Sequence, residues 1–143
     1  MVQRHIVIAS HSMLSKGMKE TLSFFLGDQV NAVSVITAYI DNHPIEQEIE
    51  QTFNGFSSTD EVLVFTDILS GSVNQKLYKY IKREHTHIIA GMNLPLIMAM
   101  MMEPSDKYIS SERVKSIVAD ARNQIQYVNA INSLSNEGDI DDE

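Results

Sequence analysis

Near its N-terminus the chain contains Arg4-His5-Ile6-Val7-Ile8-Ala9-Ser10-His11-Ser12, an apolar run that becomes polar at its end. Apolar residues at helical spacing begin directly afterwards. The stretch therefore predicts a buried strand over residues 4–9, a tight turn, and a helix from Ser12 or Met13 to about Leu26. His11 would then lie at the carboxyl end of the first strand, which is the edge of an open α/β sheet where ligands and chemistry collect.

Strands and helices are expected to alternate along the rest of the chain. Apolar and β-branched runs predict further strands over residues 30–37, 61–66 and 86–91, and helical spacing predicts helices over 44–53, 72–83, 95–102 and 111–133. Residues 107–109 fit either a short extra strand or a loop. The alternation is typical of an α/β protein with right-handed crossovers. We expect a flavodoxin-like, doubly wound parallel sheet with strand order 2-1-3-4.

The composition indicates a small globular protein. The 143 residues suit one domain, which we place at residues 1–135, followed by an acidic tail over 136–143 that we expect to be disordered. No apolar run approaches the roughly 20 residues of a membrane span, and the N-terminus lacks the pattern of a signal peptide. The absence of cysteine excludes disulfides and thiolate metal sites. We therefore expect a cytoplasmic protein, and the net charge of -8 argues against nucleic acid as a partner.

Asp67 directly follows the third predicted strand. With strand order 2-1-3-4 the first and third strands are neighbours about 4.8 Å apart, so the side chains of Asp67 and His11 should come within hydrogen-bond reach. A carboxylate that holds one ring nitrogen of a histidine fixes its tautomer and leaves the other nitrogen free as a base, a ligand or a nucleophile. Asp67 also suits a second role as the N-cap of the next helix.

The neighbouring residues favour a nucleophilic histidine that carries phosphate. Ser72 lacks the second glycine of a nucleophile elbow, and two residues are fewer than the three or four ligands that zinc needs, so we expect no metal. Ser12, Gly71 and Ser72 are the candidate phosphate-binding residues, since they lie at helix starts and offer hydroxyl groups. Ser72 is equally suited to capping its helix. The sequence has no nucleotide-binding motif, so we expect no cofactor and a phosphate that comes from another protein.

Three stretches, Ile6–Ser12, Val64–Ser72 and Ile88–Leu96, resemble motifs of the mannose-type enzyme IIA of the bacterial sugar phosphotransferase system. The resemblance extends in order and spacing over roughly residues 4–130. It implies a phosphoryl carrier that accepts phosphate on His11 from the histidine phosphocarrier protein, with Asp67 orienting the ring. A IIB component would take the group next, and the IIC and IID membrane subunits would import the sugar.

The resemblance implies three further features. The protein would be a homodimer in which a C-terminal strand pairs across subunits, and residues 107–109 are the candidate segment. Asn93 and Pro95 would form a rim at the same edge as His11, although a turn and a helix start are the simplest explanation of these two residues. No second domain or Ala/Pro-rich linker follows residue 133, so we expect the IIB component to be a separate chain.

The chain departs from the family pattern after Asp67. The family usually has two glycines followed by Ser-Pro, whereas Ser70 and Val73 replace the first glycine and the proline here. We therefore expect a loop of different shape, which leaves open whether Ser70 and Ser72 contact phosphate. Three alternative functions also stay open. They are the phosphotransfer subunit of a dihydroxyacetone kinase, a regulatory docking module that carries no phosphohistidine, and a hydrolase that uses the His11–Asp67 pair on water.

Overall fold

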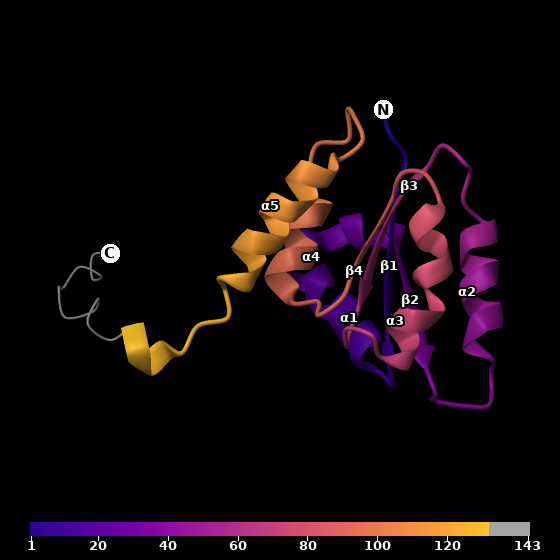
Figure 1. The fold of residues 1–143 in the computed structure, drawn as a ribbon, viewed down its shortest axis with the longest axis horizontal. Helices are drawn as coiled ribbons and strands as arrows, with labels where there is room; N and C mark the ends of the chain where they lie inside the picture. The colour runs from indigo at the N-terminus through magenta and orange to yellow at the C-terminus, as the bar shows by residue number, and fades with distance from the viewer. Residues whose placement is uncertain (132–143) are drawn as a thin grey trace.

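Four parallel strands form one sheet in the computed structural model, which describes residues 1–131. The strands are β1 (Arg4–His11), β2 (Val33–Ala38), β3 (Glu61–Thr66) and β4 (Thr86–Ile89), in the order β2-β1-β3-β4. Helices lie on both faces of this sheet (Figure 1). The arrangement confirms the predicted α/β class, the doubly wound parallel sheet and its strand order.

The two central strands are covered on both faces, as their continuous apolar runs require. Every residue of β3 is buried, and so are the five residues from Ile6 to Ser10 in β1. Ile8 and Phe65 face one half of the core, and Val7 and Val64 face the other. The helices of the first half are α1 (Leu14–Leu26), α4 (Leu94–Met101) and α5 (Ser111–Arg122), and those of the second half are α2 (Ile45–Asn54) and α3 (Ser72–Lys76).

The second strand begins three residues later than predicted. Residues Gly27–Ala32 form a short 3-10 helix, η1, whose first residue, Gly27, has a φ of 58°. Val30 was predicted to begin the strand, but its side chain packs into the core from this 3-10 helix. The ladder starts only at Val33, which pairs with Ile6 of β1. Val30 is therefore buried from a 3-10 turn and not by sheet pairing, while Asn31 and Ala32 are exposed.

The predicted helix over residues 72–83 is divided in two. α3 ends at Lys76, and residues Tyr78–Lys82 form a second 3-10 helix, η2, with backbone bonds from Tyr80 to Leu77 and from Arg83 to Tyr80. The tighter turn places the Tyr80 ring flat on the Phe53 ring, with 3.8 Å between the ring centroids. The prediction was wrong here because helical spacing alone does not distinguish one long helix from two short turns that bury the same face.

The last helix is also shorter than predicted. α5 ends at Arg122, and the chain then leaves the body of the molecule before the short 3-10 helix η3 (Val128–Ile131) (Figure 1). Ile125 and Val128 continue the apolar stripe of α5 in the sequence, yet their side chains are exposed. Residues 132 and 133, with the predicted disordered tail over 136–143, lie outside the described residues.

Residues 107–109 form a loop, and not the extra strand that was the alternative prediction. The loop is held against the start of the sheet within the same chain. Ile109 is buried, its N–H donates to Oε2 of Glu61 at 2.7 Å, and its carbonyl lies 2.9 Å from Nε2 of His87. The hydroxyl of Tyr108 donates to the carbonyl of Thr59. The segment makes these contacts within its own chain, and its role as the exchanged strand of a dimer remains a prediction.

Candidate active site

β1 and β3 lie side by side and run in the same direction, so their carboxyl ends meet at one edge of the sheet. His11 is the last residue of β1, and Asp67 is the first residue after β3. The Nδ1 atom of His11 lies 2.8 Å from Oδ2 of Asp67, and the backbone N–H of His11 donates to the same oxygen at 2.8 Å. The backbone N–H of Ile68 donates to Oδ1 at 2.8 Å. The structure thus brings together the two residues that the topology paired.

These contacts determine where the proton of the imidazole lies. Burial of the Asp67 side chain, which is 10% exposed, pushes its pKa upward. The backbone and ring N–H groups of His11 and the N–H of Ile68 outweigh burial and leave the pKa of Asp67 below its usual value. An ionised carboxylate can only accept hydrogen bonds, so Nδ1 of His11 carries the proton that it receives. The lone pair of a neutral ring is then on Nε2, and the His11 side chain is 40% exposed.

Two hydroxyl groups are linked to this free nitrogen by successive hydrogen bonds. Oγ of Ser72, at the start of α3, lies 3.2 Å from Nε2 of His11. The hydroxyl of Tyr39 donates to the same Oγ at 2.9 Å. Tyr39 was not among the predicted site residues. It follows β2, which neighbours β1, so the strand order itself is a signal that places this residue at the same edge.

The backbone around His11 is strained. Ser12, Tyr39 and Ser70 adopt φ values of 54°, 67° and 62°, in the left-handed region that non-glycine residues rarely occupy. The N–H of Ser12 donates to the carbonyl of Ala38 at 2.8 Å, which ties the ends of β1 and β2 together. Such outliers persist only where the surrounding contacts hold them, and they cluster at functional sites.

Comparison with known proteins agrees with this geometry. Residues 5–118 match the family model described as PTS system fructose IIA component, EIIA-man. The chain belongs to this family. The resemblance to mannose-type enzyme IIA is therefore confirmed, and with it the assignment of the chain as an IIA component of a sugar phosphotransferase system.

Relatives of known identity include the PTS system mannose-specific EIIAB component of Escherichia coli strain K12. It is 26% identical over 132 residues, which cover 87% of this chain and 39% of the relative. The chain thus corresponds to well under half of the length of that relative.

Solved structures show the same fold. A protein described as a phosphoenolpyruvate-dependent sugar phosphotransferase system permease from Klebsiella pneumoniae superposes with a TM-score of 0.82 and 29% identity, over 90% of this chain and 93% of that chain. A PTS IIA protein associated with the fucose utilization operon of Streptococcus pneumoniae superposes with a TM-score of 0.73 and 24% identity, over 90% and 96% of the two chains.

The loop after Asp67 is where this enzyme IIA departs from the family pattern, and Asn74 supports it. The Asn74 side chain is buried, accepts from the N–H of Ser70 at 3.0 Å, and donates to the hydroxyl of Thr66 at 3.0 Å. Ser70 stands where the family usually has glycine, and it keeps the positive φ that suits glycine. The loop therefore has a left-handed backbone at Ser70, a conformation that suits glycine, and the hydrogen bond to the Asn74 side chain supports it.

The other two predicted phosphate contacts, Ser12 and Gly71, have backbone N–H groups that are already hydrogen-bonded. The backbone N–H groups of Ser12 and Gly71 already donate to the carbonyls of Ala38 and Ile68. A Cβ atom at Gly71 would lie 3.2 Å from the Cβ and the carbonyl oxygen of Ile68. Gly71 therefore permits the close turn of the loop, and what Ser12 offers to a phosphoryl group is its exposed hydroxyl.

Asn93 and Pro95 have structural partners at the start of α4. The side chain of Asn93 accepts from the N–H of Leu96 at 2.9 Å and donates to the carbonyl of Ala121 at 3.1 Å, so it joins the start of α4 to the end of α5. Pro95 lies in the first turn of α4. The predicted rim role of these two residues remains a prediction beside these contacts.

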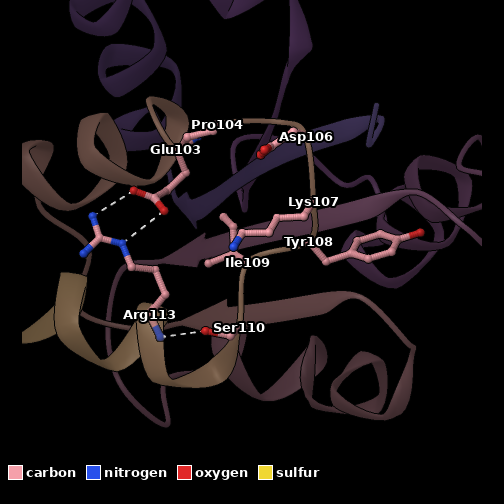
Figure 2. A pocket seen from close by; sticks show the side chains of 8 residues that line it. All are labelled: Glu103, Pro104, Asp106, Lys107, Tyr108, Ile109, Ser110 and Arg113. Atoms are coloured by element: carbon pink, nitrogen blue, oxygen red, sulfur yellow. Dashed lines mark hydrogen bonds and ion pairs between the residues drawn. The ribbon is translucent and has the colours of Figure 1, made fainter.

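The opposite edge of the sheet carries a cleft of about 350 Å³ between the end of α4 and the start of α5. Figure 2 shows the guanidinium of Arg113 paired with the carboxylate of Glu103 on one side and Ser110 bonded to the backbone of Arg113. The lining carries charge of both signs, from Glu103, Asp106, Lys107 and Arg113.

Across residues 1–131, no group of three or more His, Asp or Glu side chains could hold a metal ion. Over the same residues, none of the helices has the length and apolar character needed to cross a membrane.

Proposed function

We propose that this chain is a cytoplasmic phosphoryl carrier that accepts phosphate on His11 from the histidine phosphocarrier protein and passes it to a IIB component. The observation that carries the proposal is the 2.8 Å contact between Nδ1 of His11 and the Asp67 carboxylate. This contact leaves Nε2 as the nucleophilic atom at an exposed edge. Sugar transport would follow through IIC and IID membrane subunits, to which this chain is linked only through IIB.

The transfer step uses few groups. The lone pair of Nε2 attacks the phosphorus of the donor phosphohistidine in line, the N–P bond of the donor breaks, and its electron pair stays on the donor ring nitrogen. Positive charge develops on the His11 ring, and the Asp67 carboxylate stabilises it through Nδ1–H. The hydroxyl of Ser72, 3.2 Å from Nε2, is placed to donate to a phosphoryl oxygen.

The surface around His11 suits a protein as the donor. Six apolar or aromatic side chains near this edge are each at least 47% exposed: Met13, Leu14, Tyr39, Ile40, Ile68 and Leu69. Contiguous exposed apolar side chains are typical of protein interfaces. The net charge of -8 would further favour a partner with a basic docking face.

The proposal includes a homodimer, with a different segment from the one first considered. Ile125, Tyr127 and Val128 are 76%, 72% and 69% exposed in a segment that leaves the body of the molecule (Figure 1). Apolar side chains at this exposure would be covered by a second copy of the chain. Residues 107–109 pack within their own chain, which favours the later segment as the one that a second copy would cover.

The test is the intact mass of the protein after incubation with phosphoenolpyruvate, enzyme I and the histidine phosphocarrier protein. We expect one added phosphoryl group that is labile to acid, retained in His43→Gln and lost in His11→Gln. His43 is an exposed histidine after β2 and serves as the matched control. Full labelling of His11→Gln would overturn the assignment.

This test and two further assays, of phosphoester turnover and of onward transfer, separate the alternatives. No added mass in a folded sample would favour a regulatory docking module. Turnover of a phosphoester without any donor protein would favour a hydrolase. A phosphorylated protein that passes its group to an ADP-bound partner, and not to IIB, would favour the dihydroxyacetone kinase subunit.

A further inference from the structure

Four side chains at the carboxyl edge of the sheet form one directed chain of hydrogen bonds. The Asp67 carboxylate accepts only, so Nδ1 of His11 donates to it and Nε2 is an acceptor. The hydroxyl of Ser72 must therefore donate its proton to Nε2 across 3.2 Å. This leaves Oγ of Ser72 to accept, and the hydroxyl of Tyr39 donates to it at 2.9 Å. All three bonds point from Tyr39 toward Asp67.

We propose that Tyr39 is a positioning residue for phosphoryl transfer that acts through Ser72. Its hydroxyl holds the Ser72 hydroxyl over Nε2 of His11 in the resting protein and directs the same O–H onto a phosphoryl oxygen once Nε2 carries the group. This inference rests on the proposed function, because it assigns a role within the transfer step at His11.

The conformation of Tyr39 supports a role at the site. Its φ of 67° is unfavourable for a residue with a Cβ, and its side chain is 55% exposed, so burial in the core does not offset this strain. Its contacts at the site are the bond to Ser72 and the His11 ring, whose centroid lies 5.4 Å from its own with a 42° tilt. Strain held by contacts to reactive groups is typical of functional positions.

The bonding changes during transfer give Tyr39 its effect. When the Nε2–P bond forms, the lone pair of Nε2 is consumed, and the Ser72 O–H loses its acceptor. A phosphoryl oxygen replaces that acceptor, and the proton stays on Ser72 throughout. A hydrogen bond to a charged oxygen is stronger than one to a neutral nitrogen, and a hydroxyl that itself accepts a bond is a better donor. Tyr39 therefore stabilises the phosphorylated state more than the resting state.

The experiment compares Tyr39→Phe, Ser72→Ala and the double variant in single-turnover transfer from the phosphorylated histidine phosphocarrier protein. Phenylalanine keeps the exposed ring that a donor would contact and removes only the hydroxyl. We expect Tyr39→Phe to lower the rate at saturating donor about threefold to tenfold, the size associated with one hydrogen bond. The donor concentration at half saturation should stay unchanged, and the loss should disappear in the Ser72→Ala background.

Tyr78→Phe is the matched control. The Tyr78 hydroxyl, in η2, lies 3.4 Å from Oγ of Ser70, so its hydrogen-bond partner is Ser70 and not Ser72. This variant should transfer at the wild-type rate. A second readout needs no donor: the ¹⁵N resonance of Nε2 of His11 should shift in Tyr39→Phe and stay in place in Tyr78→Phe.

The outcomes separate this inference from the function on which it rests. Wild-type rate in Tyr39→Phe, or an equal loss with and without the Ser72 hydroxyl, would overturn the role of Tyr39 while the carrier function stands. A wild-type protein that takes up no phosphoryl group would overturn both. A loss that requires Ser72, together with the shifted resonance, would support the inference.

Discussion

At the scale of single residues, the three N–H groups around Asp67 predict the effect of replacing its carboxylate. An amide presents one oxygen and one NH₂ group, so in Asp67→Asn a donor must face either Ile68 N–H or the His11 N–H groups. An NH₂ group facing His11 would favour the tautomer that protonates Nε2 and removes the nucleophile. We expect phosphoryl acceptance to fall at least a hundredfold, by analogy with the loss of about 10⁴ in a serine protease triad. The time course of intact mass measures the loss, and wild-type kinetics would leave Asp67 only the structural role of accepting from the backbone N–H groups of His11 and Ile68.

The same variant has a predictable dependence on pH. The pKa of Asp67 is lowered in the folded protein despite burial, because His11 and Ile68 donate to it. A lowered folded pKa contributes stability that is fully present above the unfolded value of about 3.9 and is lost as the pH falls through the folded value. The difference in urea midpoint between wild type and Asp67→Asn should therefore narrow from pH 6 toward pH 3. A difference in urea midpoint that stays constant from pH 6 to pH 3 would contradict a stabilising, ionised carboxylate at Asp67.

Substitutions at Ser70 and Gly71 should change the stability of the protein in opposite directions. Ser70→Gly relieves a left-handed backbone, which costs about 1–2 kcal/mol, and adds unfolded-chain freedom of about 0.5–1 kcal/mol, so we expect a small net stabilisation. Gly71→Ala places a Cβ 3.2 Å from Ile68 and should destabilise the protein by moving the loop. Thermal unfolding of both variants tests the pair. Destabilisation by Ser70→Gly would mean that the Ser70 hydroxyl matters more than its backbone.

His11 and Asp67 could be found from sequence because each follows a continuous apolar strand and the strand order makes those strands neighbours. Tyr39 was missed because its role depends on a hydroxyl contact with Ser72, 33 residues away, and on a left-handed turn that tyrosine rarely forms. The local sequence pattern does not predict such a contact. The order of β2 and β1 does indicate it, because it places the carboxyl ends of these two strands side by side.

At the scale of elements, a buried ion pair joins the starts of β1 and β3 to the segment between α4 and α5. Glu61 has a fully buried side chain, and its Oε1 accepts from Nε of Arg4 at 2.6 Å. The Arg4 guanidinium also donates to the carbonyls of Glu103 and Pro104, and Oε2 of Glu61 accepts from Ile109 N–H. The pair thus holds both ends of the loop whose cleft Figure 2 shows.

Removing one member of this pair should destabilise the fold without disturbing the site. Glu61→Ala leaves the Arg4 charge buried without its partner, and such losses cost about 3–5 kcal/mol. Urea unfolding measures the change, and labelling of the folded fraction at His11 should persist because the pair lies at the opposite edge of the sheet. Arg113→Ala, which breaks the half-exposed pair with Glu103, is the comparison and should move the midpoint much less. Equal effects of the two variants would contradict a special role for the buried pair.

The elements themselves were predicted best where tertiary packing and local pattern agree. β3 has the predicted bounds because all six residues are buried between two layers. The stretch 72–83 was predicted as one helix, and it is divided because Tyr80 stacks on Phe53 from a tighter turn. Such a contact between α2 and η2 is invisible to the periodicity of either segment.

At the scale of the whole molecule, the apolar stripe of α5 continues in sequence beyond the surface that it can cover. Val114 and Ile117 pack against the core, whereas Ile125 and Val128 are exposed in the segment that departs from the body. The periodicity correctly predicted apolar side chains here, but it wrongly predicted that they pack within a continuous last helix. Nothing in the described part of the same chain covers these side chains. A second copy of the chain is the partner proposed above.

The oligomeric state should therefore depend on the segment that follows α5, which includes Ile125 and Val128. Replacing Ile125 and Val128 with serine removes the apolar surface that a partner would bury, so the protein should sediment as a monomer where wild type sediments as a dimer. Phe24→Ser is the control, because Phe24 is 83% exposed on α1 and lies outside this segment. A monomeric Phe24→Ser protein beside a dimeric Ile125→Ser/Val128→Ser protein would place the interface on α1 instead. Since His11 and Asp67 lie within one chain, the monomeric variant should still accept one phosphoryl group.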